Sequence, residues 1–203
     1  MAIESSRTTE PVAEVPRGGA MGTWGIWLGV LVLTMFVAGL ATAALYLETS
    51  QPAWPPESID VPQRGTAMLG VALAGAGAAA ASWALRRMRA AERRSAAAAL
   101  MWSGAALIGS VAALVADLGA AGFRWDAHAY ASVYWSLTGF VITFVAVAAM
   151  MVAAVLLQTL TGLVDEHRHQ ELSNTTIYLW FTFLTTVVLL SLVHGLPAVG
   201  GGG

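Results

Sequence analysis

The chain has 203 residues, of which 57% are hydrophobic and 11% charged, and its formal net charge is −2. A soluble domain of this size leaves roughly a third of its unfolded surface in water, which so apolar a composition does not allow. The absence of Cys excludes disulfides and thiol chemistry, and the charge gives no reason to expect nucleic acid as a partner.

Residues 1–23 come before the first apolar stretch and contain Glu4, Glu10 and Glu14. This segment is too long and too acidic for the first region of a signal peptide, so we expect a largely disordered cytoplasmic tail and a retained first helix. Residues 24–195 then form the membrane domain, and the glycine-rich residues 196–203 a flexible C-terminal tail.

Five stretches of the chain are long and apolar enough to cross a bilayer, which takes about 20 residues of helix. Membrane-spanning segments must pair their own backbone groups, and Ala- and Leu-rich runs without alternation do not make barrel strands. The sequence therefore predicts an all-α, polytopic transmembrane bundle. Its helices are expected over residues 24–47, 66–85, 95–116, 130–160 and 175–193. The fourth exceeds the bilayer thickness and should tilt or project into water.

The second of these stretches, around residues 70–78, consists largely of Gly and Ala. Helices in lipid associate through close packing, which small residues allow. We therefore expect neighbouring helices around this segment.

The arginines are distributed unequally between the two sides of the predicted bundle. Alternating sides along the chain leaves only Arg64 and Arg124 on one side. The other side holds Arg7, Arg17, Arg86, Arg87, Arg89, Arg93, Arg94 and Arg168. Cytoplasmic loops are enriched in Arg and Lys, so the N-terminus is predicted in the cytoplasm and the C-terminus outside.

No Asp, Glu, Arg or His lies in the middle of a predicted span. Such groups are costly in hydrocarbon and usually mark ion paths or substrate sites. Glu48, Asp117 and His194 lie at predicted helix ends, where we expect water to reach them. A pump or coupled transporter acting alone is therefore not expected.

The four histidines give no convincing cofactor site. Haem ligation between helices needs facing His pairs, and neither His128 nor His194 is so placed. His167 and His169, with Asp165, Glu166 and Glu171, have ligand types suited to a divalent cation, although a hydrated loop is the favoured interpretation. We expect no catalytic, cofactor or metal ligand in the chain.

Hydroxyl groups near the helix ends have ordinary structural interpretations. Ser132, Ser136 and Thr138 are expected to bond a carbonyl one turn back or a neighbouring helix. Ser173 and Asn174 resemble a helix cap.

The basic turn between the second and third stretches permits two interpretations. Its arginines either contact anionic lipid headgroups or simply anchor a cytoplasmic turn. The candidate headgroup contacts are Arg86, Arg87, Arg93 and Arg94, with Arg89 in the same cluster.

Three segments together resemble the cytochrome c oxidase subunit III family in its shortened five-helix form. The first is Trp24-Gly25-Ile26-Trp27-Leu28, with the exit Ala44-Leu45-Tyr46-Leu47-Glu48. The second, residues 52–62 with Trp54-Pro55-Pro56 and Thr66 following, is similar to the family's Trp-Pro-Pro loop. The third, residues 129–140 from Ala129-Tyr130 to Thr138-Gly139-Phe140, resembles the opening of its long helix. Asn174 to Trp180 resembles the start of the last helix more weakly.

The resemblance covers about residues 24–195, and several polar positions of the family are apolar here. Val32 and Leu33 stand where the family commonly has Ser-Glu, and Val141 and Phe144 replace two histidines. Residues 179–183 replace a Trp-His-Phe-Val-Asp run. A role of the missing carboxylate in proton uptake therefore does not carry over, whereas fold, partner and scaffolding do.

The resemblance implies a non-catalytic accessory subunit of a haem-copper terminal oxidase in a bacterial or archaeal cell membrane. Haem and copper would then reside in the partners, subunit I and also subunit II, with bound phospholipid as a further ligand. One alternative is an accessory subunit of a nitric oxide reductase or a divergent oxidase. Another is a free-standing transporter of a neutral solute, with a polar path lined by Thr175, Thr176, Thr182, Thr185, Thr186 and Ser191.

Overall fold

A computed structural model describes residues 19–52, 54, 64–163 and 169–194, with side chains from Gly22 onward. They form five α-helices and, within these ranges, no strand. The helices are α1 (Gly19–Ser50), α2 (Arg64–Arg89), α3 (Arg93–Gly119), α4 (Ala129–Thr161) and α5 (Gln170–His194). Each one contains a predicted span and extends beyond it.

All five helices are long and apolar enough to cross a membrane, so the all-α transmembrane prediction is confirmed and the chain is a multi-pass membrane protein. Of the predicted tails, residues 1–23 and 196–203, the segments 1–18 and 196–203 lie outside the described residues, whereas residues 19–23 belong to α1, so this part of the tail prediction is wrong. The fourth helix is long, as expected, with 33 residues, but α1 is nearly as long, with 32. At 1.5 Å per residue, α4 measures about 50 Å.

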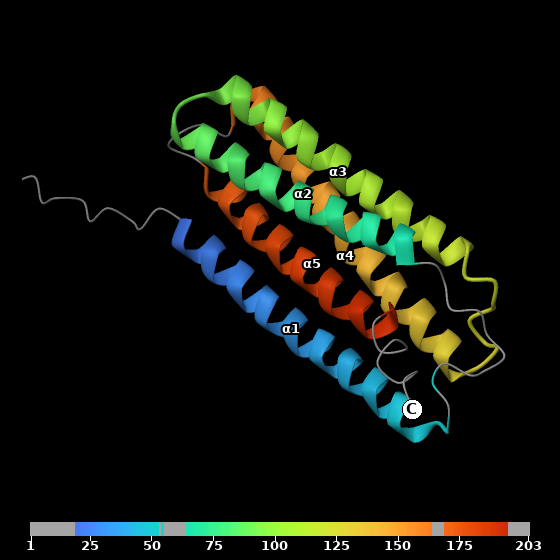
Figure 1. Cartoon of the computed structure of the whole chain (residues 1–203). Helices are drawn as coiled ribbons and strands as arrows, with labels where there is room; N and C mark the ends of the chain where they lie inside the picture. Colours follow the sequence, from blue (N-terminus) through green and yellow to red (C-terminus); the bar gives the residue numbers. More distant parts are fainter. Residues whose placement is uncertain (1–18, 53, 55–63, 164–168, 195–203) are drawn as a thin grey trace, which may run out of the picture.

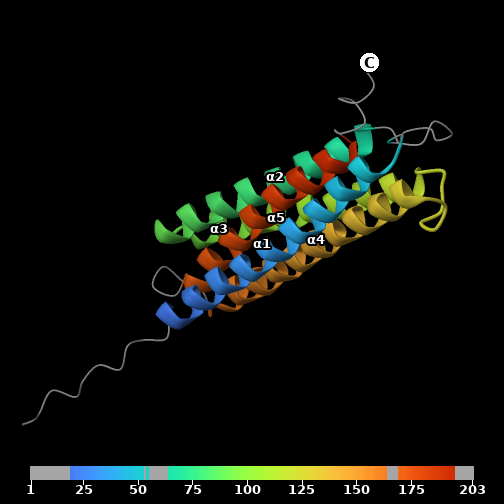
Figure 2. The ribbon, with the colours of Figure 1, turned by 90° about the horizontal axis from the view of Figure 1, so that it is seen from below.

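The helices lie side by side, and α5 occupies the centre of the bundle. It packs against α1, α2 and α4, whereas α1 packs on α5 and to a smaller extent on α4. In Figure 1, α5 lies between α1 and α2, with α3 on the outer side of α2. Figures 1 and 2 both place the starts of α1, α3 and α5 at one end, together with the ends of α2 and α4. The ends of α1, α3 and α5 therefore meet the starts of α2 and α4 at the opposite end.

Helices α2 and α3 make the most extensive contact between two helices, and a hydrogen bond from a serine to a glycine carbonyl repeats in it after seven residues. Ser103 Oγ donates to the carbonyl of Gly77 at 2.8 Å. One heptad further along α3, Ser110 Oγ donates to the carbonyl of Gly70 at 2.7 Å. Because both glycines lack a side chain, the helices approach closely enough for a seryl group to reach the backbone opposite.

Leucines of α3 fill the space that these glycines leave. A Cβ atom on Gly77 would lie 2.9 Å from Cγ of Leu107, and one on Gly70 would lie 2.8 Å from Leu114. Both leucines are fully buried. The expected close packing of the small-residue helix is thus present on this face, while Met68, Leu69 and Trp83 on the same helix are exposed in this chain.

The C-terminal end of α4 is capped by a side chain of α3, which the sequence did not predict. Arg93 donates from Nε to the carbonyl of Thr159 at 2.7 Å and from a terminal nitrogen to that of Leu160 at 2.8 Å. Helix α4 ends there at Gly162, whose φ of 84° suits a residue without Cβ. The predicted cap at Ser173 and Asn174 is wrong, because α5 already begins at Gln170.

Candidate functional site

Asp117, in the last turn of α3, is the centre of a buried polar cluster. Its Oδ1 accepts a 2.6 Å hydrogen bond from Thr66 of α2. Its Oδ2 accepts a 2.6 Å bond from the hydroxyl of Tyr134 in α4. With 1% of its surface exposed, Asp117 is inaccessible to water in this chain. One carboxylate therefore connects three helices through short, charge-assisted hydrogen bonds.

His194, the last residue of α5, adds the fourth helix. Its Nε2 lies 3.4 Å from Oδ2 of Asp117, close enough for an ion pair when the ring is protonated. The residue is 6% exposed, and neither ring nitrogen makes a hydrogen bond with a described residue. We refer to Thr66, Asp117, Tyr134 and His194 as the polar cluster.

The expectation that water reaches Asp117 and His194 is wrong. Both residues are at helix ends, as predicted, but the helices continue past the predicted limits at Ala116 and Val193 and carry the two side chains into the bundle. Glu48 of α1, by contrast, is partly exposed. A buried charge needs partners, and the first turn of α2 and the early part of α4 provide them.

Aromatic rings cover the polar cluster at this end of the bundle. Phe123 lies edge-on to Tyr134 at 5.4 Å between ring centroids and to Tyr130 at 6.0 Å. Tyr130 also meets the ring of Trp54 at 5.3 Å. These contacts keep water away from Asp117 and so strengthen its hydrogen bonds.

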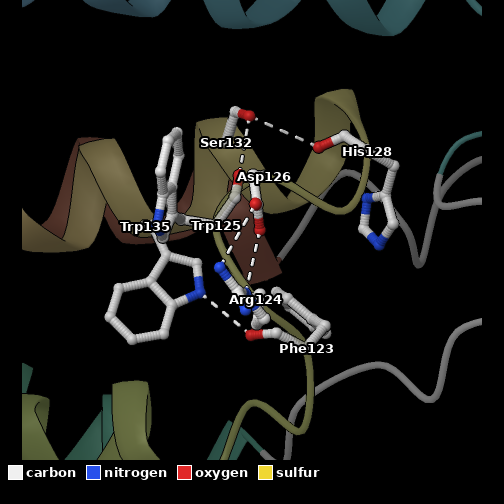
Figure 3. Close-up of polar contacts among 7 residues, drawn as sticks. All are labelled: Phe123, Arg124, Trp125, Asp126, His128, Ser132 and Trp135. Carbon is white, nitrogen blue, oxygen red and sulfur yellow. Dashed lines mark hydrogen bonds and ion pairs between the residues drawn. The ribbon is translucent and has the colours of Figure 1, made fainter.

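The α3–α4 connection is itself held by polar contacts (Figure 3). The indole of Trp135 donates to the carbonyl of Phe123 at 3.2 Å, and Ser132 Oγ donates to that of Trp125 at 2.8 Å. Arg124 pairs with Asp126, with Nε 3.2 Å from Oδ1. His128 caps α4 by accepting the amide of Ala131 at its Nδ1, 2.9 Å away. The loop therefore holds Phe123 over the cluster.

The polar cluster can clamp four helices, because Thr66, Tyr134 and His194 of three helices meet the carboxylate of Asp117 in α3. A transmembrane relay would need further titratable groups along the bundle. Among the described residues, the hydroxyls of Thr176 and Thr186 donate within their own helix at 2.8 Å each. Ser191 does the same at 2.7 Å. The hydroxyls of these three residues are therefore committed to local backbone bonds.

A groove between α2 and α5 runs up to the polar cluster. It has a volume of about 600 Å³, and its walls include Val71, Gly75, Phe183 and Leu190. Arg64 and His194 also line it. A second hollow, of about 400 Å³, lies at the other end between α1, α4 and α5 and contains Gln158 and Glu171.

The arginines of the α2–α3 turn differ in their contacts. Arg93 is bound to the α4 carbonyls described above. Arg87 forms an ion pair with Glu92 at 2.8 Å, and its guanidinium carbon lies over the ring of Trp83, 5.3 Å from the ring centroid. Arg86 and Arg94 are exposed and make no hydrogen bond or ion pair with described residues. Of the four candidate headgroup contacts, these two have the freest guanidinium groups.

The histidine-containing segment is only partly covered by the structure. Asp165, Glu166 and His167 lie outside the described residues, while His169 and Glu171 lie within them. No group of three His, Cys, Asp or Glu that could hold a metal occurs in the described ranges.

The order of the helices alone could have predicted the polar cluster. In a five-helix bundle the ends of odd helices meet the starts of even ones, which places Asp117 and His194 beside Thr66 and Tyr134. Polar groups brought together in an apolar environment are expected to pair.

The fold and the cluster at its end define a multi-pass helical membrane protein that joins its helices through a buried carboxylate. Comparison of the sequence with protein-family models gave no match, and comparison with curated proteins gave none either.

Proposed function

We propose that this chain is a structural subunit of the cytochrome c oxidase subunit III type, packed beside the haem- and copper-bearing subunit of a terminal oxidase. The observation that carries the proposal is the meeting of two segments on which the family resemblance rests. Trp54 of the Trp-Pro-Pro segment contacts Tyr130 of the aromatic segment. Thr66 and Tyr134, which belong to the same two segments, share Asp117. The two segments that carry the resemblance are thus in contact through Trp54 and Tyr130, and both donate a hydrogen bond to the same carboxylate.

The burial of α1 supports a partner on that side. Only 11% of its most apolar window is buried within the chain, against 50% for α5. Trp24, Leu28, Leu31 and Met35 recur at helical spacing on α1 and are 57–71% exposed. A second membrane subunit can pack along such a stripe. The proposed work of the chain is to steady and shield that subunit, which carries the redox chemistry.

The proposed location is a bacterial or archaeal cell membrane, with the N-terminus in the cytoplasm and the C-terminus outside. The Arg-rich turn between α2 and α3 supports this orientation. The polar cluster then lies at the outer side of the membrane.

Purification of the tagged full chain from its native membrane in mild detergent tests the proposal. We expect a haem-containing partner to co-purify in a fixed ratio, with copper and with a reduced-minus-oxidised haem spectrum. An unrelated tagged membrane protein from the same cells serves as the control. Recovery of the chain without haem would contradict the proposal. Turnover of nitric oxide but not oxygen by the purified complex would assign it to a nitric oxide reductase instead.

A further inference from the structure

The groove between α2 and α5 has about the length of one leaflet of the hydrocarbon core. It runs from Arg64, the first residue of α2, to Gly75. At 1.5 Å per residue this is about 16 Å, and half of a hydrocarbon core is about 15 Å. At the deep end, Phe183 lies against Gly75, where an added Cβ would be 2.8 Å from its ring.

Arg64, the first residue of α2, and His194, the last of α5, line the groove at the same end of the bundle, whereas the hydroxyl of Ser191, the third polar lining residue, is bonded to the carbonyl of Val188. Arg64 is exposed and makes no hydrogen bond or ion pair with a described residue. His194 lines the same end and is 94% buried; its Nε2 lies 3.4 Å from Oδ2 of Asp117, while its Nδ1 has no hydrogen-bond partner among the described residues. Because buried polar groups are normally paired, the unpartnered Nδ1 of a residue that lines the groove indicates a ligand.

The charge at this end favours an anion. Among the described residues that line the groove there is no Asp or Glu. The described carboxylate beside His194, that of Asp117, is 1% exposed and bound to Thr66 and Tyr134, so it does not present a negative surface. An amphiphile with an anionic head therefore meets a cation, while the walls beyond it are apolar.

We propose that this groove binds one acyl chain of an anionic phospholipid, whose phosphate lies against Arg64 and His194. Arg64 recognises the phosphate as a charged donor, and His194 contributes a ring nitrogen from inside the protein. The lipid comes from the leaflet at the outer end of the groove. The site is distinct from the Arg86–Arg94 turn, which lies at the opposite end of the bundle, and it does not depend on the oxidase proposal.

Native mass spectrometry of the full chain in mild detergent tests this site. Phosphatidylglycerol and phosphatidylcholine with identical acyl chains are titrated separately. We expect one phosphatidylglycerol to be retained in preference to phosphatidylcholine. Arg64→Gln should weaken its retention about fivefold, the contribution of one basic residue near a charged headgroup. Arg124→Gln, at the same end but outside the groove, is the matched control and should have no effect.

A second pair of variants tests the apolar part of the site. Ala72 is exposed and lines the groove, so Ala72→Phe fills the groove without entering the core. Ala79 is exposed on the same helix but does not line it, so Ala79→Phe is the control. We expect only Ala72→Phe to release the lipid, with helix content unchanged in both.

Three results would overturn the proposal. They are equal retention of the two lipids, equal losses in Arg64→Gln and Arg124→Gln, and undiminished binding in Ala72→Phe. Displacement of the lipid by an isoprenoid quinone at equal concentration would also overturn it, because the groove would then select a neutral head.

Discussion

The hydroxyl of Tyr134 donates a 2.6 Å hydrogen bond to Oδ2 of Asp117, and both residues are almost fully buried. This bond joins α4 to α3 at the end of the bundle where Thr66 and His194 also meet the carboxylate. Its contribution can be measured because removal of one hydroxyl leaves the aromatic packing in place.

We expect Tyr134→Phe to lower the free energy of unfolding by about 1–2 kcal/mol, as for a buried bond to a charged group within a membrane bundle. Unfolding of the isolated chain by a denaturing detergent gives the value. Tyr46 of α1 provides the control, because this residue is 69% exposed and Tyr46→Phe removes its hydroxyl. Equal effects of the two variants would show that the bond to Asp117 contributes nothing.

Gly77 should tolerate no methyl group. An added Cβ would lie 2.9 Å from the buried Leu107, so Gly77→Ala forces α2 and α3 apart. We expect a loss of about 1–3 kcal/mol, typical of overpacking. Gly139 of α4 has no atom within 4 Å of an added Cβ, so Gly139→Ala should be neutral or stabilise by up to about 1 kcal/mol. The same unfolding assay distinguishes them, and a stable Gly77→Ala variant would refute the close contact.

Arg93 should stabilise the end of α4, whereas its neighbour Arg94 should not. Arg93→Gln weakens the bonds to the carbonyls of Thr159 and Leu160. We expect the last turn of α4 to exchange its amide hydrogens about tenfold faster, since such bonds contribute about 1.4 kcal/mol or more. Hydrogen exchange read by mass spectrometry reports this. Arg94→Gln, which changes an exposed side chain without a described partner, is the control, and faster exchange there too would contradict the assignment.

The proposed orientation predicts which loops react from outside the cell. The chain has no Cys, so single-cysteine variants can be labelled without background. Ala127, in the α3–α4 loop, and Ala90, in the α2–α3 turn, are both exposed. We expect a membrane-impermeant maleimide to label A127C in intact cells and A90C only after lysis. The reverse pattern would invert the topology.

The sequence was sufficient to predict the number, order and type of the helices, because a bilayer admits only helices or closed barrels and Ala- and Leu-rich runs without alternation do not form barrel strands. The packing face of α2 was partly predictable from Gly70 and Gly77. Their seryl partners on α3 were not, since the register between two helices depends on side-chain fit that a single helix does not reveal.

The polar cluster was missed for a different reason. Hydropathy placed the end of α3 three residues early and that of α5 one residue early, so Asp117 and His194 were expected at helix ends that water reaches. An Asp lowers the mean hydropathy of a window whether or not its carboxylate is paired. Only the three-dimensional neighbourhood, with Thr66 and Tyr134 in reach, distinguishes a buried Asp from a solvated one.

The position of α1 has a consequence for biogenesis. Its main contact is α5, although α2, α3 and α4 are synthesised between them. The α2–α3 hairpin can assemble as soon as α3 has left the translocon, because α2 and α3 are consecutive in the chain. Helix α1 must instead wait in the lipid, largely unpaired, until Gln170–His194 is inserted. During that interval its apolar stripe is available to the partner subunit proposed above, and assembly of the proposed complex would then begin before this bundle closes.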